Sequence, residues 1–219
     1  MSGQANLYRD SGFNDIILSP QLGPEIHSGK DKLQLLAGPA WRWYGGASYT
    51  RSVAANGSWL HPLGMRSQVR VDGGYAHIDN RQNNLQDGES YSLSLGLDHS
   101  ISARLGGGLK FSSMRQTAND PGYSTASGGF NGFLYRDTGR ATFVVGLGYN
   151  HLEADKRLFL FPKRRVDDRF TANLSGTFRM LRLGQWAPVA RVFYERNRST
   201  LTLYDYSRIA AEFGLSAAF

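Results

Sequence analysis

The sequence predicts an all-β protein, an antiparallel transmembrane β-barrel of the outer-membrane type, and three observations support this fold. The mean hydropathy of the 219 residues is −0.40, and no apolar run reaches the length of about 18 residues that a spanning helix needs. Apolar and polar residues instead alternate with a period of two along many segments, which is the pattern of a strand with two different faces. Short turns and longer polar loops alternate between these segments, as they do in outer-membrane barrels.

The alternation is most regular in residues 169–180, where Phe170 and Leu174 share one face and Arg169 and Asn173 share the other. Its length fits the roughly 9–11 residues with which a tilted strand crosses a bilayer. About eleven strands are predicted, at residues 15–26, 32–44, 48–60, 65–77, 90–99, 103–114, 127–136, 141–152, 169–181, 186–196 and 204–219.

Residues 1–219 are predicted to form a single barrel domain without a periplasmic helical-repeat domain. Because bacterial single-chain barrels contain an even number of strands, we expect either a short twelfth strand at residues 5–10 or a larger barrel that lacks its N-terminal strands here. The first residues have neither the basic nor the apolar region of a signal peptide, so a mature form or a fragment is expected.

The composition excludes several classes of protein. Cysteine is absent, so disulfides and thiolate metal sites are excluded. The net charge is +7, but the basic residues recur at alternate strand positions rather than along one helix or stripe, so nucleic acid is not the expected partner. A soluble β-sandwich also alternates, but Arg, Asp, Lys and Asn on the polar face fit the wet interior of a membrane barrel better.

The C-terminus resembles the insertion signal recognised by the barrel-assembly machinery of the bacterial outer membrane. The last strand carries Phe213, Leu215 and Phe219 on one face, and Phe219 is the final residue. This pattern predicts an outer-membrane location, with membrane lipid, lipopolysaccharide and the assembly machinery as partners.

Charged residues on the last strands are predicted to face the lumen. They are expected to form a network with two interpretations, a set of ion pairs that stiffens the wall or a polar path for a polypeptide. The residues are Arg169, Arg179, Arg191, Glu195, Arg208 and Glu212.

The predicted loop at residues 155–168 combines basic residues with the apolar run 158–161. The basic side chains can pair with lipopolysaccharide phosphates, or they can contact a client protein. Whether the apolar run folds into the barrel, enters the lipid or meets a client stays open. The basic residues are Lys156, Arg157, Lys163, Arg164 and Arg165.

No catalytic or metal site is predicted, and no cofactor. Of the five histidines, His77 with Asp79 and His151 with Asp155 lie near the outer end of predicted strands and could in principle activate a nucleophile. No serine stands in a nucleophile motif, and no cluster has metal-ligand spacing. The sequence therefore predicts a protein that is not an enzyme.

The last third of the chain resembles the C-terminal barrel of the surface lipoprotein assembly modifier (Slam) family. The resemblance rests on a strand that begins at Pro188, the Arg-Asn-Arg-Ser run at 196–199, the start Tyr204-Asp205-Tyr206-Ser207-Arg208 and the terminal Phe219. It implies an outer-membrane translocon barrel that assists the export or surface display of lipoproteins or related effector proteins. A general porin, and a barrel enzyme acting on lipid A, phospholipid or peptide, are the alternatives.

Overall fold

In the computed structural model, which describes residues 2–7, 9–182 and 184–217, the chain forms one 13-stranded antiparallel sheet. No helix in the described part of the chain is long and apolar enough to cross a membrane. The strands are β1 (Ser2–Asn6), β2 (Asp15–Ser19), β3 (Glu25–Ser28), β4 (Asp31–Tyr44), β5 (Ala47–Pro62), β6 (Ser67–Asn80), β7 (Gly88–Ser102), β8 (Leu105–Ala118), β9 (Thr125–Asp137), β10 (Ala141–Ala154), β11 (Val166–Phe178), β12 (Trp186–Ser199) and β13 (Tyr206–Ala217). Four short 3-10 helices lie in the connections, η1 (Ser11–Phe13), η2 (Asn84–Gln86), η3 (Arg179–Leu181) and η4 (Thr202–Tyr204).

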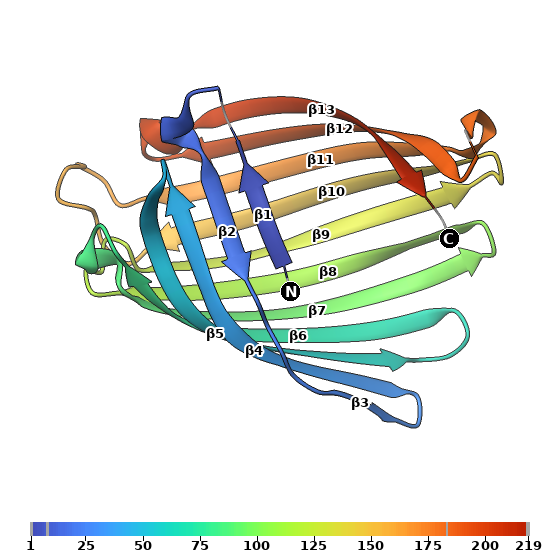
Figure 1. Cartoon of the computed structure of the whole chain (residues 1–219), viewed down its shortest axis with the longest axis horizontal. Coiled ribbons are helices and arrows are strands. Elements are labelled where there is room, and N and C mark those ends of the chain that lie inside the picture. The colour runs from blue at the N-terminus through green and yellow to red at the C-terminus, as the bar shows by residue number, and fades with distance from the viewer. Residues whose placement is uncertain (1, 8, 183, 218–219) are drawn as a thin grey trace.

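The sheet follows the order of the chain, from β1 through β2 and β4 to β13, and β3 pairs with β4 beside this path. Figure 1 shows the sheet curling on itself, so that β1 and β2 cross steeply in front of the later strands. Over the described residues, β1 and β13 are the two edges and no ladder joins them. The fold is therefore a barrel-like sheet with a seam between its first and last strands.

The strand predicted at residues 15–26 is interrupted. β2 and β3 both lie along β4, and between them Leu22 makes a single bridge to Ala37. Pro20 and Pro24 flank this bridge, and neither has a backbone N–H to donate to the ladder. The period-two pattern is thus correct, but the prolines divide one predicted strand into two short ones.

Other strand limits also differ from the prediction. β1 lies at Ser2–Asn6 rather than at residues 5–10, and the strand expected at residues 169–181 is β11 at Val166–Phe178. Arg179 then begins η3 instead of continuing the strand. Most strands extend further than their clearest alternation, so the long loops are shorter than the sequence pattern indicates, whereas the connection at residues 179–185 is longer.

The fold contains almost no conventional hydrophobic core. Among the described residues, the buried apolar side chains are only Ala141, Ala154, Ala187 and Leu201. Large apolar side chains lie on the outside instead and are more than a third exposed, which is the arrangement of a wall that faces lipid. Examples from successive strands are Leu95, Phe111, Leu134, Leu147, Phe170, Leu174, Val192 and Ile209.

Aromatic side chains mark one end of this apolar band. Towards the longer connections the ring centroids of Tyr75 and Tyr91 are 5.3 Å apart, and those of Tyr149 and Phe170 are 5.0 Å apart. The Tyr149 hydroxyl donates a 2.6 Å hydrogen bond to Asp168. The side chain therefore combines an apolar ring with a polar, hydrogen-bonded end. Such amphipathic rings are typical of a membrane interface.

The connections distinguish the two ends of the barrel. The longer ones, at residues 81–87, 119–124, 155–165 and 200–205, gather at the left end of Figure 1, and most turns at the right end contain only a few residues. The connection at 179–185 is the longer exception at the turn end. In outer-membrane barrels the end with longer loops is extracellular.

The two faces of β11 predict opposite responses to an introduced charge. Leu174→Arg places a guanidinium in the lipid near the middle of the strand and should lower the free energy of unfolding by about 2–4 kcal/mol. Asn173→Arg, the control on the lumen face, should have a much smaller effect. Urea unfolding in lipid vesicles, followed by tryptophan fluorescence, measures both, and equal losses would contradict the assignment of faces.

Candidate functional site

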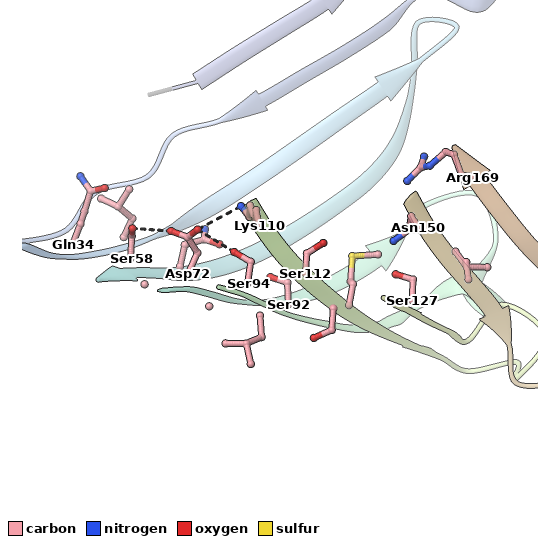
Figure 2. Close-up of a pocket in the computed structure, with 18 residues that line it drawn as sticks. Gln34, Ser58, Asp72, Ser92, Ser94, Lys110, Ser112, Ser127, Asn150 and Arg169 are labelled. Atoms are coloured by element: carbon pink, nitrogen blue, oxygen red, sulfur yellow. Dashed lines mark hydrogen bonds and ion pairs between the residues drawn. The ribbon is translucent and has the colours of Figure 1, made fainter. Parts of the chain in front are cut away.

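A cavity of about 620 Å³, called the polar cavity below, lies along the inner wall; small and polar residues from β4 to β11 form most of its lining, together with the apolar residues Leu36, Leu93, Met114 and Leu152. Figure 2 shows its labelled side chains, mostly serines, amides and three charged residues, projecting from successive strands. Serine and amide side chains both donate and accept hydrogen bonds. This wall can therefore solvate a polar chain without offering a strong net charge.

Asp72 on β6 organises one end of the cavity. Its carboxylate accepts hydrogen bonds from Ser58 Oγ on β5 at 2.7 Å and from Ser94 Oγ on β7 at 3.0 Å, and it pairs with Lys110 Nζ on β8 at 3.5 Å. Ser58 and Ser94 are the direct register partners of Asp72. Four neighbouring strands are thus joined at one level, and the charge of Asp72 is balanced within the wall.

Glycines on β10 let amide side chains lie flat against the wall. A Cβ at Gly148 would be 2.1 Å from Asn131 Oδ1, and one at Gly146 would be 2.6 Å from Asn173 Nδ2. A larger residue at either position would push these amides into the lumen. The glycine-rich strand therefore keeps the wall polar and the interior open.

The predicted charge network on the last strands is only partly assembled. Arg191 and Glu212 face each other across β12 and β13 with a 3.9 Å ion pair between largely exposed side chains. Glu195 is in register with Arg208, but its carboxylate accepts a hydrogen bond from the Tyr206 hydroxyl. Within the described part of the chain, Glu195 and Arg208 form no ion pair.

Arg169 lies near the start of β11, and Arg179 lies just beyond its end. Arg169 borders the polar cavity beside Asn150, as Figure 2 shows. Arg179 lies in η3, where its Nη2 binds both carboxylate oxygens of Asp137 at 2.6 Å and Thr142 Oγ1 at 2.8 Å. Arg179 thus ties the turn after β9 to the connection after β11 and is not a neighbour of the other charges.

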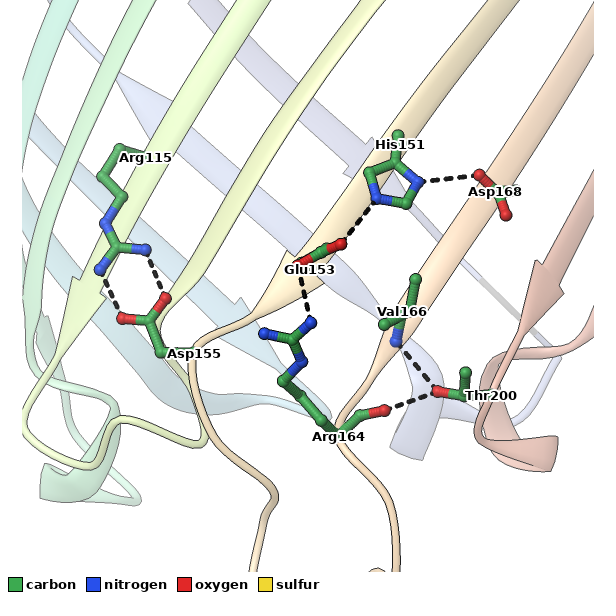
Figure 3. A network of polar contacts seen from close by, with 8 residues as sticks. All are labelled: Arg115, His151, Glu153, Asp155, Arg164, Val166, Asp168 and Thr200. Atoms are coloured by element: carbon green, nitrogen blue, oxygen red, sulfur yellow. Dashed lines mark hydrogen bonds and ion pairs between the residues drawn. The ribbon is translucent and has the colours of Figure 1, made fainter.

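A second polar cluster lies on the outside of the barrel, above Tyr149 at the loop end (Figure 3). We call it the outer collar, and it is made of ion pairs between neighbouring strands and loops. Its members are Arg115, His151, Glu153, Asp155, Arg164 and Asp168.

The outer collar fixes both ends of the loop at residues 155–165. Arg115 Nη1 donates to Asp155 Oδ1 at 2.6 Å, and a second guanidinium nitrogen bonds to the other oxygen. Arg115 thereby holds the pKa of the Asp155 carboxyl below its ordinary value. At the other end of the loop, Arg164 Nη2 donates to Glu153 at 2.8 Å.

In the described part of the chain, no histidine has both a hydroxyl and a carboxylate as bonded partners. His99 Nδ1 is 2.8 Å from Ser67 Oγ but is bonded to no carboxylate there. His151 Nδ1 is 2.8 Å from Asp168, and its Nε2 is 3.2 Å from Glu153. Asp155, the partner expected for His151, is instead engaged by Arg115. No serine or threonine hydroxyl is bonded to His151 in the part of the chain described, nor do three His, Asp or Glu residues there form a group suited to a metal ion.

The predicted surface residues lie where the alternation indicated, as far as they are described. Phe213 and Leu215 are highly exposed on the outer face of β13, whereas Phe219 lies outside the described residues. Sequence reasoning missed the Asp72 cluster and the Tyr206–Glu195 bond. The parity of Asp72 and Lys110 could have indicated lumen-facing charges, but only the strand register shows that they meet.

Comparison with known proteins is consistent with this architecture. The NanC porin is 13% identical, aligns over 99% of this chain and 97% of its own, and has a TM-score of 0.51. The KdgM porin is 11% identical over 94% of this chain and 91% of its own, with a TM-score of 0.42. The likeness to the NanC porin concerns the fold alone. No curated protein sequence matches the chain.

The sequence matches the family described as surface lipoprotein assembly modifier over residues 2–219. This match covers nearly the whole sheet, including the lumen wall and the outer collar, and it agrees with a bacterial outer-membrane location. The chain belongs to the surface lipoprotein assembly modifier family.

Proposed function

We propose that this barrel is a passive conduit along which lipoprotein clients, or related effector proteins, reach the cell surface. The observation that carries the proposal is the polar cavity, whose lining extends from Gln34 on β4 to Arg169 on β11. An extended polypeptide must satisfy its backbone N–H and C=O groups wherever it leaves bulk water. A wall of hydroxyl and amide groups meets that need without selecting a sequence.

The compensated charges support the same conclusion. Asp72 is already engaged by two serines and by Lys110, so it does not hold a passing cation tightly. Arg191 and Glu212 stay largely exposed, 64% and 72%, at 3.9 Å. A weak, alternating charge pattern lets a chain of mixed composition bind briefly and move on.

The seam between β1 and β13 offers a second supporting feature. Both edges have unpaired backbone groups over the described residues, and an incoming extended segment can add to such an edge by strand pairing. The seam also gives an acylated client a route by which a lipid anchor can remain in the membrane. We propose no covalent chemistry in this process, because His151 has acidic partners but no bound hydroxyl nucleophile.

The partners follow from the two faces of the sheet. We propose that the barrel-assembly machinery recognises the C-terminal strand, with Phe213 and Leu215 on its lipid face, and that the outer collar meets lipopolysaccharide headgroups. A general porin is the rival function, since a polar lumen would also pass small solutes. A porin should conduct ions equally well with and without a client, whereas the current through a conduit for extended protein should be blocked while a client occupies the lumen.

Stability measurements should show whether the lumen charges on β12 and β13 act in folding or in function. Exposed ion pairs contribute about 0–1 kcal/mol, so Glu212→Gln should change the free energy of unfolding by less than about 1 kcal/mol. Urea unfolding in vesicles tests this expectation. A loss of several kcal/mol would mean that the charges act by holding the wall together.

Surface display tests the proposed function itself. Replacing Arg191, Glu195, Arg208 and Glu212 by Gln removes two positive and two negative charges and leaves the net charge unchanged. Display of a co-expressed dependent lipoprotein, measured by antibody labelling of intact cells, should fall several-fold while the barrel level in the outer membrane is maintained.

The matched control for this experiment is His77→Ala, a change on the outer face of β6. It should leave display normal. Full display without the four lumen charges, or loss of display in the control, would refute the proposed path.

A further inference from the structure

The connection between β10 and β11, residues 155–165, is built differently from the other loops. We call it the tip loop. In Figure 1 it extends beyond every other connection at the loop end of the barrel. It also combines five basic residues with the apolar run at 158–161. The tip loop does not line the lumen, so the proposed path of a client along the lumen gives this segment no role.

The base of the tip loop is held firmly on both sides. Besides the ion pairs of Asp155 and Arg164 with the outer collar, Asp155 N donates to Ser124 O at 2.9 Å. Thr200 Oγ1 donates to Arg164 O at 2.7 Å and accepts from Val166 N at 3.0 Å. The loops on both sides thus support the base, and this restraint lowers the entropy that the tip loses on binding.

The tip itself is a turn closed by a 3.0 Å hydrogen bond from Phe161 N to Leu158 O. Leu158 is directed towards the neighbouring loop, where a Cβ on Gly122 would be 2.9 Å from its Cδ2 atom. Phe159 and Leu160 are directed away and are 95% and 84% exposed. The apolar run therefore does not fold into the barrel, and two large side chains remain in contact with water.

The cations around the tip fall into two groups. Arg164 and Arg165 are paired with Glu153 and Asp167. In the part of the chain that the structure describes, no carboxylate pairs with Lys156, Arg157 or Lys163, which are all exposed. Two exposed apolar residues are thus accompanied by three uncommitted positive charges, a composition that fits a pocket with an acidic border.

The position of the tip favours a protein over the membrane as its ligand. The aromatic band at Tyr149 and Phe170 marks the outer limit of the lipid-facing wall, and His151 and Glu153 of the outer collar follow Tyr149 on β10 towards the tip loop. The tip loop continues from the collar along the barrel axis and away from this band (Figure 1). The tip loop, with the exposed Phe159 and Leu160, therefore lies at the end of the barrel where a client would emerge.

We propose that the tip loop is a docking site for the acidic surface of a lipoprotein client on the outer side of the membrane. Phe159 and Leu160 enter an apolar pocket of the client, and Lys156, Arg157 and Lys163 face the surrounding carboxylates. This inference rests on the proposed function, because it takes the client of that conduit as the occupant. In this inference the tip loop captures a client after that client has crossed the outer membrane.

The test uses the full chain in nanodiscs and a lipoprotein identified by losing its surface display when the gene for this chain is deleted. The probe is the purified, acyl-free form of that lipoprotein. The double change Phe159→Ser and Leu160→Ser should weaken binding at least tenfold in an optical biosensor. Changing Lys156, Arg157 and Lys163 to Glu should slow association at low salt, and added salt should then speed association where it slows association of the unchanged chain.

The matched control is the double change Leu63→Ser and Met65→Ser in the turn between β5 and β6. These residues are 59% and 104% exposed and lie at the opposite end of the barrel. The control should bind the probe normally. Unchanged binding by the tip variants, or an equal loss in the control, would overturn the docking site.

One further measurement, and a comparison of the tip variants with the lumen variants, separate this inference from its alternatives. The fluorescence of Phe159→Trp, corrected for the native tryptophans, should be insensitive to brominated lipids, and strong quenching would assign the tip to the membrane instead. If the tip variants bind normally while the four lumen changes abolish display, docking fails and the conduit stands. If the tip variants lose binding while the lumen changes leave display intact, the conduit fails and the docking site stands.

Discussion

The need to satisfy every backbone hydrogen bond without water determines most of this structure. In the hydrocarbon of a membrane, an unpaired N–H or C=O costs several kcal/mol, so the chain forms one sheet in which each strand pairs with its neighbours. That constraint places the apolar side chains outside and the polar ones inside. It also explains why almost no large apolar side chain is buried, since lipid replaces the core that a soluble domain would need.

The same constraint explains what could be predicted from the sequence. The alternation around Leu174 and Asn173 indicates a strand and its two faces, because one face must suit lipid and the other water. The outward position of Phe213 follows from parity in the same way. By contrast, the division of residues 15–26 into two strands depends on Pro20 and Pro24. A period-two pattern alone does not predict it, because the pattern ignores the missing backbone N–H of proline.

Contacts between strands were much harder to predict. Parity indicates that Asp72 and Lys110 share the lumen face, but their meeting depends on the stagger of β6, β7 and β8. Arg179 illustrates the opposite error, because a regular pattern was extended past the end of β11 into η3. The bond between Tyr206 and Glu195 depends on the orientation of individual side chains, about which a period of two carries no information.

The first two strands give the wall an uneven mechanical strength. β2 is joined to β4 through only the four residue pairs from Asp15 to Leu18, reinforced by the bidentate bond between Arg42 and Asp15 at 2.8 and 2.9 Å. β10 and β11 are joined by pairs along almost their whole length. The hairpin of β1 and β2 therefore resembles a flap on a short hinge, and a pull on the wall from within would detach it before it separated the long ladders between β4 and β13.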